Sequence, residues 1–116
     1  MNSKRQKLIE ILRETRAFLE RRDNDFAWSS WEDAPAALRE IDAIVTRIES
    51  GDMPQRADIE VLFLPTGPIQ EVGLSSGWGQ QFVELASRFD SAIEQAYGVA
   101  WFSQVTRLLP ENWRPK

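Results

Sequence analysis

Apolar residues recur every three or four positions in three long segments of the chain, with charged residues between them. This spacing places apolar side chains on one face of a helix and is typical of helices that pack on a core. It predicts helices at residues 4–22, from about Asp33 to Ser50, and at 77–97. The predicted core-facing residues are Leu8, Ile11, Leu12, Thr15, Phe18 and Leu19 in the first segment, Leu38, Ile41, Ile44, Val45 and Ile48 in the second, and Phe82, Leu85, Ala86, Phe89, Ile93, Ala96 and Tyr97 in the third.

Turn and capping residues separate these helices. Asp23-Asn24-Asp25 is predicted to end the first helix, because these residues prefer turns. The Asp33 carboxylate can cap the free amides of the second helix, and Pro35 falls in its first turn, where a missing N–H does no harm. Ser50-Gly51-Asp52 closes that helix, with glycine suited to the left-handed cap. Ser75 or Ser76 is predicted to cap the third helix, and Gly98 to end it.

Residues 55–64 fit two patterns. Ile59, Val61 and Phe63 alternate as in a strand, whereas Ile59, Leu62 and Phe63 share a helical face. A short helix is favoured, because the chain offers no second clean strand for pairing. Residues 99–109 predict a short final helix before Pro110, with apolar positions at Trp101, Phe102, Val105, Leu108 and Leu109.

The connection between residues 64 and 76 is more detailed than a link between two helices requires. Leu64-Pro65-Thr66-Gly67 suits a type I turn, with proline second and glycine fourth. Pro68 can then open a single helical turn whose Ile69 and Val72 point inward. The chain as a whole predicts an all-α fold: one compact domain over 1–116, with three main helices, short helices and one long structured loop at 64–76.

The composition excludes most enzyme chemistry. The chain has no cysteine and no histidine, so it lacks a thiolate, a disulfide and the usual general base and metal ligand. Gly73-Leu74-Ser75-Ser76-Gly77 spells a nucleophile-elbow pattern, but a serine nucleophile needs a histidine base. Asp23-x-Asp25 lacks the later ligands of a calcium loop. We therefore expect no catalytic residue, metal or cofactor; paired carboxylates among Glu32, Asp33 and Glu71 are the enzymatic alternative.

The charge is unevenly distributed. Residues 1–22 carry seven basic and three acidic side chains, residues 23–97 carry four and fourteen, and residues 98–116 carry three and one. An acidic body disfavours nucleic acid as a partner and can attract a basic protein surface. The basic N-terminus is interrupted by Glu10, Arg13 and Glu14, so it predicts an amphipathic helix and not a secretion signal. No membrane span is expected, which makes a cytoplasmic protein the default.

Tryptophan is the residue type best suited to a contact surface here. It supplies a large apolar area and one N–H donor, which fits both a cover for the core and a binding hot spot. The core role is favoured for Trp28, Trp31 and Trp78, and a contact role is the alternative. The candidate partner-binding residues are Trp28, Trp31, Glu32, Asp33, Thr66, Gln70, Glu71, Trp78 and Gln81.

Three segments also carry a resemblance. Residues 25–31 (a Trp-x-x-Trp segment), the Pro65-Thr66-Gly67-Pro68-Ile69-Gln70-Glu71 loop and Gly77-Trp78-Gly79 resemble a family of small bacterial proteins with no assigned activity. In size and acidity the chain is also similar to the immunity proteins that accompany bacterial polymorphic toxins. The second resemblance is one of type, and it implies an inhibitor that acts by steric occlusion.

Three functions follow as hypotheses. The first is a non-enzymatic protein-binding module, in the form of an immunity-type inhibitor of a basic toxin. The second is a small-molecule-binding or carboxylate-dependent enzyme domain centred on residues 65–81, with a concave pocket lined by Trp78 and Gln70. The third is a structural homo-oligomer in which the tryptophans meet across a two-fold axis.

Overall fold

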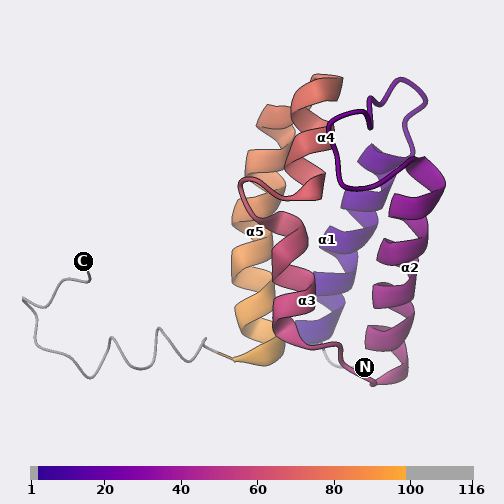
Figure 1. Cartoon of the computed structure of the whole chain (residues 1–116). Helices are drawn as coiled ribbons and strands as arrows, with labels where there is room; N and C mark the ends of the chain where they lie inside the picture. Colours follow the sequence, from indigo (N-terminus) through magenta and orange to yellow (C-terminus); the bar gives the residue numbers. More distant parts are fainter. Residues whose placement is uncertain (1–2, 99–116) are drawn as a thin grey trace, which may run out of the picture.

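Three long helices frame the protein: α1 (Ser3–Leu19), α2 (Ala34–Ser50) and α5 (Gly79–Tyr97). In this computed structural model, which describes residues 3–98, α1 packs against both α2 and α5 (Figure 1). The shorter α3 (Arg56–Glu60), the 3-10 helix η1 (Val61–Phe63) and α4 (Pro68–Ser76) run alongside α5. Over the described residues there is no strand, and the predicted all-α bundle is confirmed.

The buried face of α1 is wider than a single stripe because the helix has neighbours on two sides. Leu8, Leu12 and Leu19 are fully buried, as predicted, and Ile9 is buried beside them although it lies off the predicted stripe. The one buried polar side chain of the described core, Thr15, donates its hydroxyl hydrogen to the Ile11 carbonyl at 2.8 Å. That bond satisfies the hydroxyl within its own helix, so the position needs no outside partner.

The ends of α2 follow the sequence signals. The Asp33 carboxylate accepts a hydrogen bond from the Ala36 amide at 3.0 Å, which satisfies one of the free N–H groups of the first turn. Gly51 ends the helix in the left-handed conformation, with φ of 84°, and its N–H donates to the last turn. The predicted capping by Asp33 and Gly51 is therefore confirmed.

Residues 55–64 form the helical alternative, as α3 followed by η1. The predicted turn also forms, since the Gly67 amide donates to the Leu64 carbonyl at 2.8 Å. The structure then differs from the prediction over 68–76: what was expected to be one helical turn within a long loop is the nine-residue helix α4. Ile69 and Val72 are buried, as expected.

The serines expected to cap the third helix lie elsewhere. Ser75 and Ser76 form the last turn of α4, and Trp78 is the residue at the start of α5, without a side-chain cap. Gly77 separates the two helices in the left-handed conformation, with φ of 87°. Gly98 ends α5, as predicted. The helix expected at 99–109 lies outside the described residues.

Ion pairs join α1 to both of its neighbours. Arg16 and Arg13 pair with Asp42 and Glu49 of α2, and Glu14 pairs with Arg88 of α5. These side chains are about one-third to one-half exposed, so each pair adds little to stability. Two basic residues of α1, Arg13 and Arg16, thus pair with carboxylates of the acidic segment 23–97. None of the helices in residues 3–98 combines the length and the hydropathy that crossing a bilayer requires.

Candidate partner-binding surface

Trp78 covers the core where α1, α4 and α5 meet. Its ring is 1% exposed and lies 5.0 Å, centroid to centroid, from the ring of Phe18. The indole Nε1 donates to the Asn24 side-chain oxygen at 2.8 Å. A Cβ at Gly73 would lie 3.0 Å from this ring, a tight contact that would require the ring or α4 to shift by a few tenths of an ångström. Trp78 is therefore part of the core and does not present a contact surface.

Trp31 has the same role at the start of α2. Its side chain is buried, and its Nε1 donates to a carboxylate oxygen of Glu40 at 2.6 Å. Burial of the ring together with a satisfied N–H is the usual arrangement for a structural tryptophan. The core-covering role favoured by the sequence thus holds for Trp31 and Trp78, and both leave the set of residues that a partner can touch.

Trp28 is different, because it is 75% exposed. Hydrogen bonds on both sides fix the backbone that carries it. The Ala27 amide donates to Asp25 Oδ1 at 2.9 Å, and the Ser29 amide donates to the Phe26 carbonyl at 3.1 Å. For Trp28 the favoured core role is wrong. The sequence could not separate it from Trp31, since the two are only three positions apart.

The loop that carries Trp28, residues 20–33, is held against α4. The Asp25 amide donates to the Ser76 hydroxyl at 2.8 Å, and the Ser29 hydroxyl donates to the Pro68 carbonyl at 3.4 Å. The two contacts lie at the two ends of α4, and the loop passes across this end of the bundle (Figure 1). The backbone that carries Trp28 is therefore held in place by hydrogen bonds to α4.

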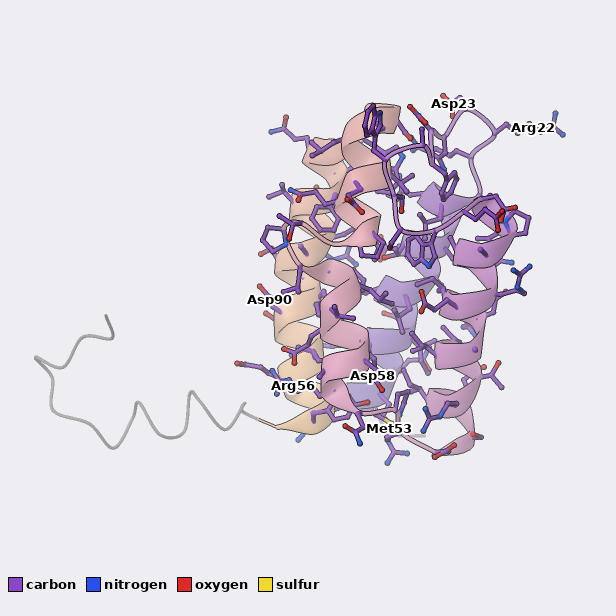
Figure 2. The ribbon with its side chains drawn as sticks, in the orientation of Figure 1. Arg22, Asp23, Met53, Arg56, Asp58 and Asp90 are labelled. Atoms are coloured by element: carbon purple, nitrogen blue, oxygen red, sulfur yellow. The ribbon has the colours of Figure 1, made fainter. Side chains whose placement is uncertain are left out.

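Carboxylates surround Trp28 in the sequence of this loop. Asp23, Asp25, Glu32 and Asp33 are all exposed, and Asp33 also caps α2. The basic residues Arg21 and Arg22 precede them, and the Arg21 guanidinium lies 4.4 Å from the centre of the Phe18 ring. Figure 2 shows Arg22 and Asp23 at the outer end of the bundle, on this loop. The segment 23–33 carries four acidic and no basic side chains, so its field is negative.

The structure separates the remaining predicted residues from this loop surface. Thr66 lies exposed in the turn before α4, and Gln81 lies exposed in the first turn of α5. Gln70 and Glu71 are half-buried in α4. Of the nine predicted residues, the loop carries Trp28, Glu32 and Asp33 as exposed groups.

Gln70 instead lines a groove between η1, α4 and α5, which sequence reasoning missed. The groove has a volume of about 510 Å³ and is lined by Glu60, Phe63, Leu64, Pro65, Gln70, Phe82, Val83, Ala86, Ser87, Phe89 and Asp90. The rings of Phe63 and Phe89 stack at 3.9 Å in its lining. The prediction of one pocket lined by both Trp78 and Gln70 is therefore wrong, because Trp78 is buried and does not line this groove. The signal available in the sequence was the pair of apolar residues Leu64 and Val83, which fall outside the predicted core stripes.

The pKa shifts of Glu14 and Tyr97 lie away from the loop. The hydrogen bond from Arg88 lowers the pKa of Glu14, and burial raises the pKa of Tyr97, whose hydroxyl donates to the Pro54 carbonyl. Among residues 3–98, no group of three or more acidic side chains is placed to hold a metal ion. The loop surface thus offers an aromatic ring and negative charge as its chemistry.

Comparison with known proteins adds no family. No family model, no curated protein and no solved structure matches the chain. The resemblances to a small bacterial family and to immunity proteins accordingly stay predictions.

Proposed function

We propose that this chain is a non-enzymatic, cytoplasmic protein-binding module that inserts Trp28 into an apolar pocket of a basic partner. The observation that carries the proposal is a tryptophan that is 75% exposed on a loop whose backbone is already fixed. Single exposed apolar residues are common on protein surfaces, but tryptophan is the residue type most enriched at interface hot spots.

The fixed loop makes such an anchor effective. Association costs the conformational entropy that side chains and loops lose when they become ordered. A loop that is already ordered in the free protein has lost much of this entropy before it binds. The hydrogen bonds of Asp25 and Ser29 to α4 hold the loop before any partner arrives. Truncation of a hot-spot tryptophan commonly weakens binding by about 2 kcal/mol or more. Trp28 is expected to fall in that class.

The carboxylates around Trp28 supply the selectivity for a basic partner. Opposite charge at the rim of an interface mainly accelerates encounter, and salt weakens the effect. An immunity-type inhibitor is the specific form of this proposal: the bundle would cover the working surface of a basic toxin and block it sterically. Asp23 and Glu32 are the rim residues to test, because reversing Asp33 would also remove the cap of α2.

The test is affinity capture from the native host with three versions of the chain. These are the wild type, Trp28→Ala and Leu74→Ala, which truncates an apolar side chain that is 66% exposed on α4. We expect a partner whose recovery falls at least about tenfold with Trp28→Ala and is unchanged with Leu74→Ala. The purified partner should then associate more slowly with Glu32→Lys, with a weaker dependence on salt. Equal recovery of every captured protein by wild type and Trp28→Ala would refute the proposal.

The alternative to a foreign partner is self-association, in which Trp28 contacts a second copy of the chain. Of the three candidate tryptophans, Trp28 is the one that presents its ring for a two-fold contact, since Trp31 and Trp78 are buried. Light scattering on wild type and Trp28→Ala separates the two cases. A dimer that dissociates with Trp28→Ala would replace the foreign partner by a second copy of the chain.

A further inference from the structure

The groove between η1, α4 and α5 has the size and the lining of a small-molecule site. Its volume of about 510 Å³ lies within the range of about 300–1,000 Å³ that is typical of ligand pockets. The stacked rings of Phe63 and Phe89 belong to its lining. Leu64 and Val83 also line it, and they are 48% and 62% exposed. A bound apolar group would remove these side chains from water, and such burial favours binding.

The chain from α3 to η1 runs antiparallel to α5 along one side of the groove. Arg56 of α3 donates from Nη1 to the carbonyl of Gly98, the residue that ends α5, at 2.7 Å. Further along, the ring of Phe63 stacks on that of Phe89, an earlier residue of α5. Figure 1 shows the same arrangement, with α3 beside the second half of α5 and α4 beside its first half. Glu60 lies between Arg56 and Phe63, so it is level with the turns of α5 that follow Phe89.

The two carboxylates that line the groove therefore lie at the same end of it. Asp90 follows Phe89 directly and lines the groove together with Glu60, and among the described residues no basic side chain does so. The Arg56 Nε lies 3.3 Å from a carboxylate oxygen of Glu60. Asp90, part-way along α5 in Figure 2, is exposed, and its carboxylate forms no ion pair or hydrogen bond within residues 3–98. In this part of the chain, the charge of Asp90 thus has no counter-ion.

We propose that the groove binds a small organic cation with an apolar body, of the class of aromatic amines. The ammonium group lies at Asp90, and the apolar ring lies between Leu64 and Val83. These two ends follow from the lining, since the free carboxylate attracts a cation and repels an anion of the same shape. Val83 and Asp90 are seven residues apart on α5, which corresponds to about 10 Å along the helix. The ligand therefore carries its amine on a chain that spans about this distance.

The site is separate from the surface proposed for Trp28. No residue of the loop 20–33 lines the groove, and the loop contacts α4 through Asp25 and Ser29. Gln70 of α4 does line the groove, and its side chain forms no hydrogen bond within the described residues. Its amide can both donate and accept, so it can bond a polar group on the body of the ligand. The inference therefore does not depend on the protein partner.

The test uses two fluorescent probes of opposite charge. Dansylcadaverine joins an aromatic ring to a primary amine through an alkyl chain, and dansyl-6-aminohexanoate joins the same ring to a carboxylate. Each is titrated into the full chain at low salt and neutral pH, and the dansyl emission reports entry into an apolar site. An exposed ion pair contributes up to about 1 kcal/mol, so the amine should bind at least about fivefold more tightly than the acid. Equal affinities, tighter binding of the acid, or binding of neither probe would overturn the proposal.

The carboxylate is tested with Asp90→Asn. This variant should bind the amine about threefold more weakly and should not bind the acid more weakly. The control is Glu84→Gln, which removes one charge from an exposed position of α5 that does not line the groove. It should leave both affinities unchanged, and circular dichroism checks that each variant is folded. If Asp90→Asn and Glu84→Gln had the same effect on the amine, the assigned position of the ammonium group would be wrong.

The apolar end is tested with Val83→Ser, which should weaken both probes by the same factor, about threefold. Trp28→Ala is the control for dansyl binding to an exposed aromatic ring elsewhere, and it should change neither affinity. A loss of probe binding with Trp28→Ala but not with Val83→Ser would place the probe on the loop and overturn the inference. That outcome would leave the role of Trp28 in binding a protein partner intact, so the two proposals fail separately.

Discussion

The contrast between the two tryptophans Trp78 and Trp28 gives the sharpest test of the structure. Trp78→Phe removes the Nε1 donor and leaves the half-buried Asn24 side-chain oxygen without it, which costs about 0.5–1.5 kcal/mol for the lost hydrogen bond. The smaller ring also leaves space against Phe18 and Gly73, which adds about 1 kcal/mol. The free energy of unfolding should therefore fall by about 1.5–2.5 kcal/mol, a large fraction of the usual total of about 5–15 kcal/mol.

The assay is urea unfolding followed by far-ultraviolet circular dichroism, since fluorescence would change with the tryptophan itself. Trp28→Phe is the matched control: the same chemical change at a site that is 75% exposed should stay within about 0.5 kcal/mol of wild type. A double-mutant cycle of Trp78→Phe with Asn24→Ala should show a coupling of about 1 kcal/mol. If Trp78→Phe were no more damaging than Trp28→Phe, the assignment of Trp78 to the core would be wrong.

Three further predictions concern local features. Asp33→Ala should lower the free energy of unfolding in urea by about 1 kcal/mol, because the Ala36 amide loses its cap. Gly67→Ala should lower it by about 1–3 kcal/mol in the same assay, since its Cβ would lie 2.7 Å from the Val61 carbonyl oxygen. Arg88 lowers the pKa of Glu14, so the ionised form adds stability above the ordinary value of 4.5, and this is lost as the pH falls. Unfolding titrations from pH 7 to 3 should therefore show a steeper acid loss for wild type than for Glu14→Gln.

The long helices could be predicted from the sequence because each carries its own signals. The apolar period, the Asp33 cap and the left-handed Gly51 all act within a few residues of one another. The helix α4 could not be recognised in this way. Gly73, Ser75 and Ser76 are poor helix formers, and the helix depends on packing against the rest of the bundle. In particular, Gly73 lies in close contact with the ring of Trp78, the residue that precedes the next helix, α5.

The candidate surface could be predicted only in part, because exposure of the tryptophans depends on distant partners. Trp31 is buried beside Glu40, nine residues away, and Trp78 bonds to Asn24, which is 54 residues away. Local spacing contains no information on either contact. The Trp-x-x-Trp spacing suggests a shared face only on a helix, and residues 28–31 are not helical. The groove is equally a product of packing, since its walls come from η1, α4 and α5.

Two separate places among the described residues carry exposed apolar side chains, the groove and the loop that carries Trp28. Leu64 and Val83 both line the groove between η1, α4 and α5. Trp28 stands on a loop that is fixed by hydrogen bonds to α4. Trp28 is the largest exposed apolar side chain in residues 3–98. A loss of partner capture that is specific to Trp28→Ala would therefore assign recognition to the loop and not to the groove.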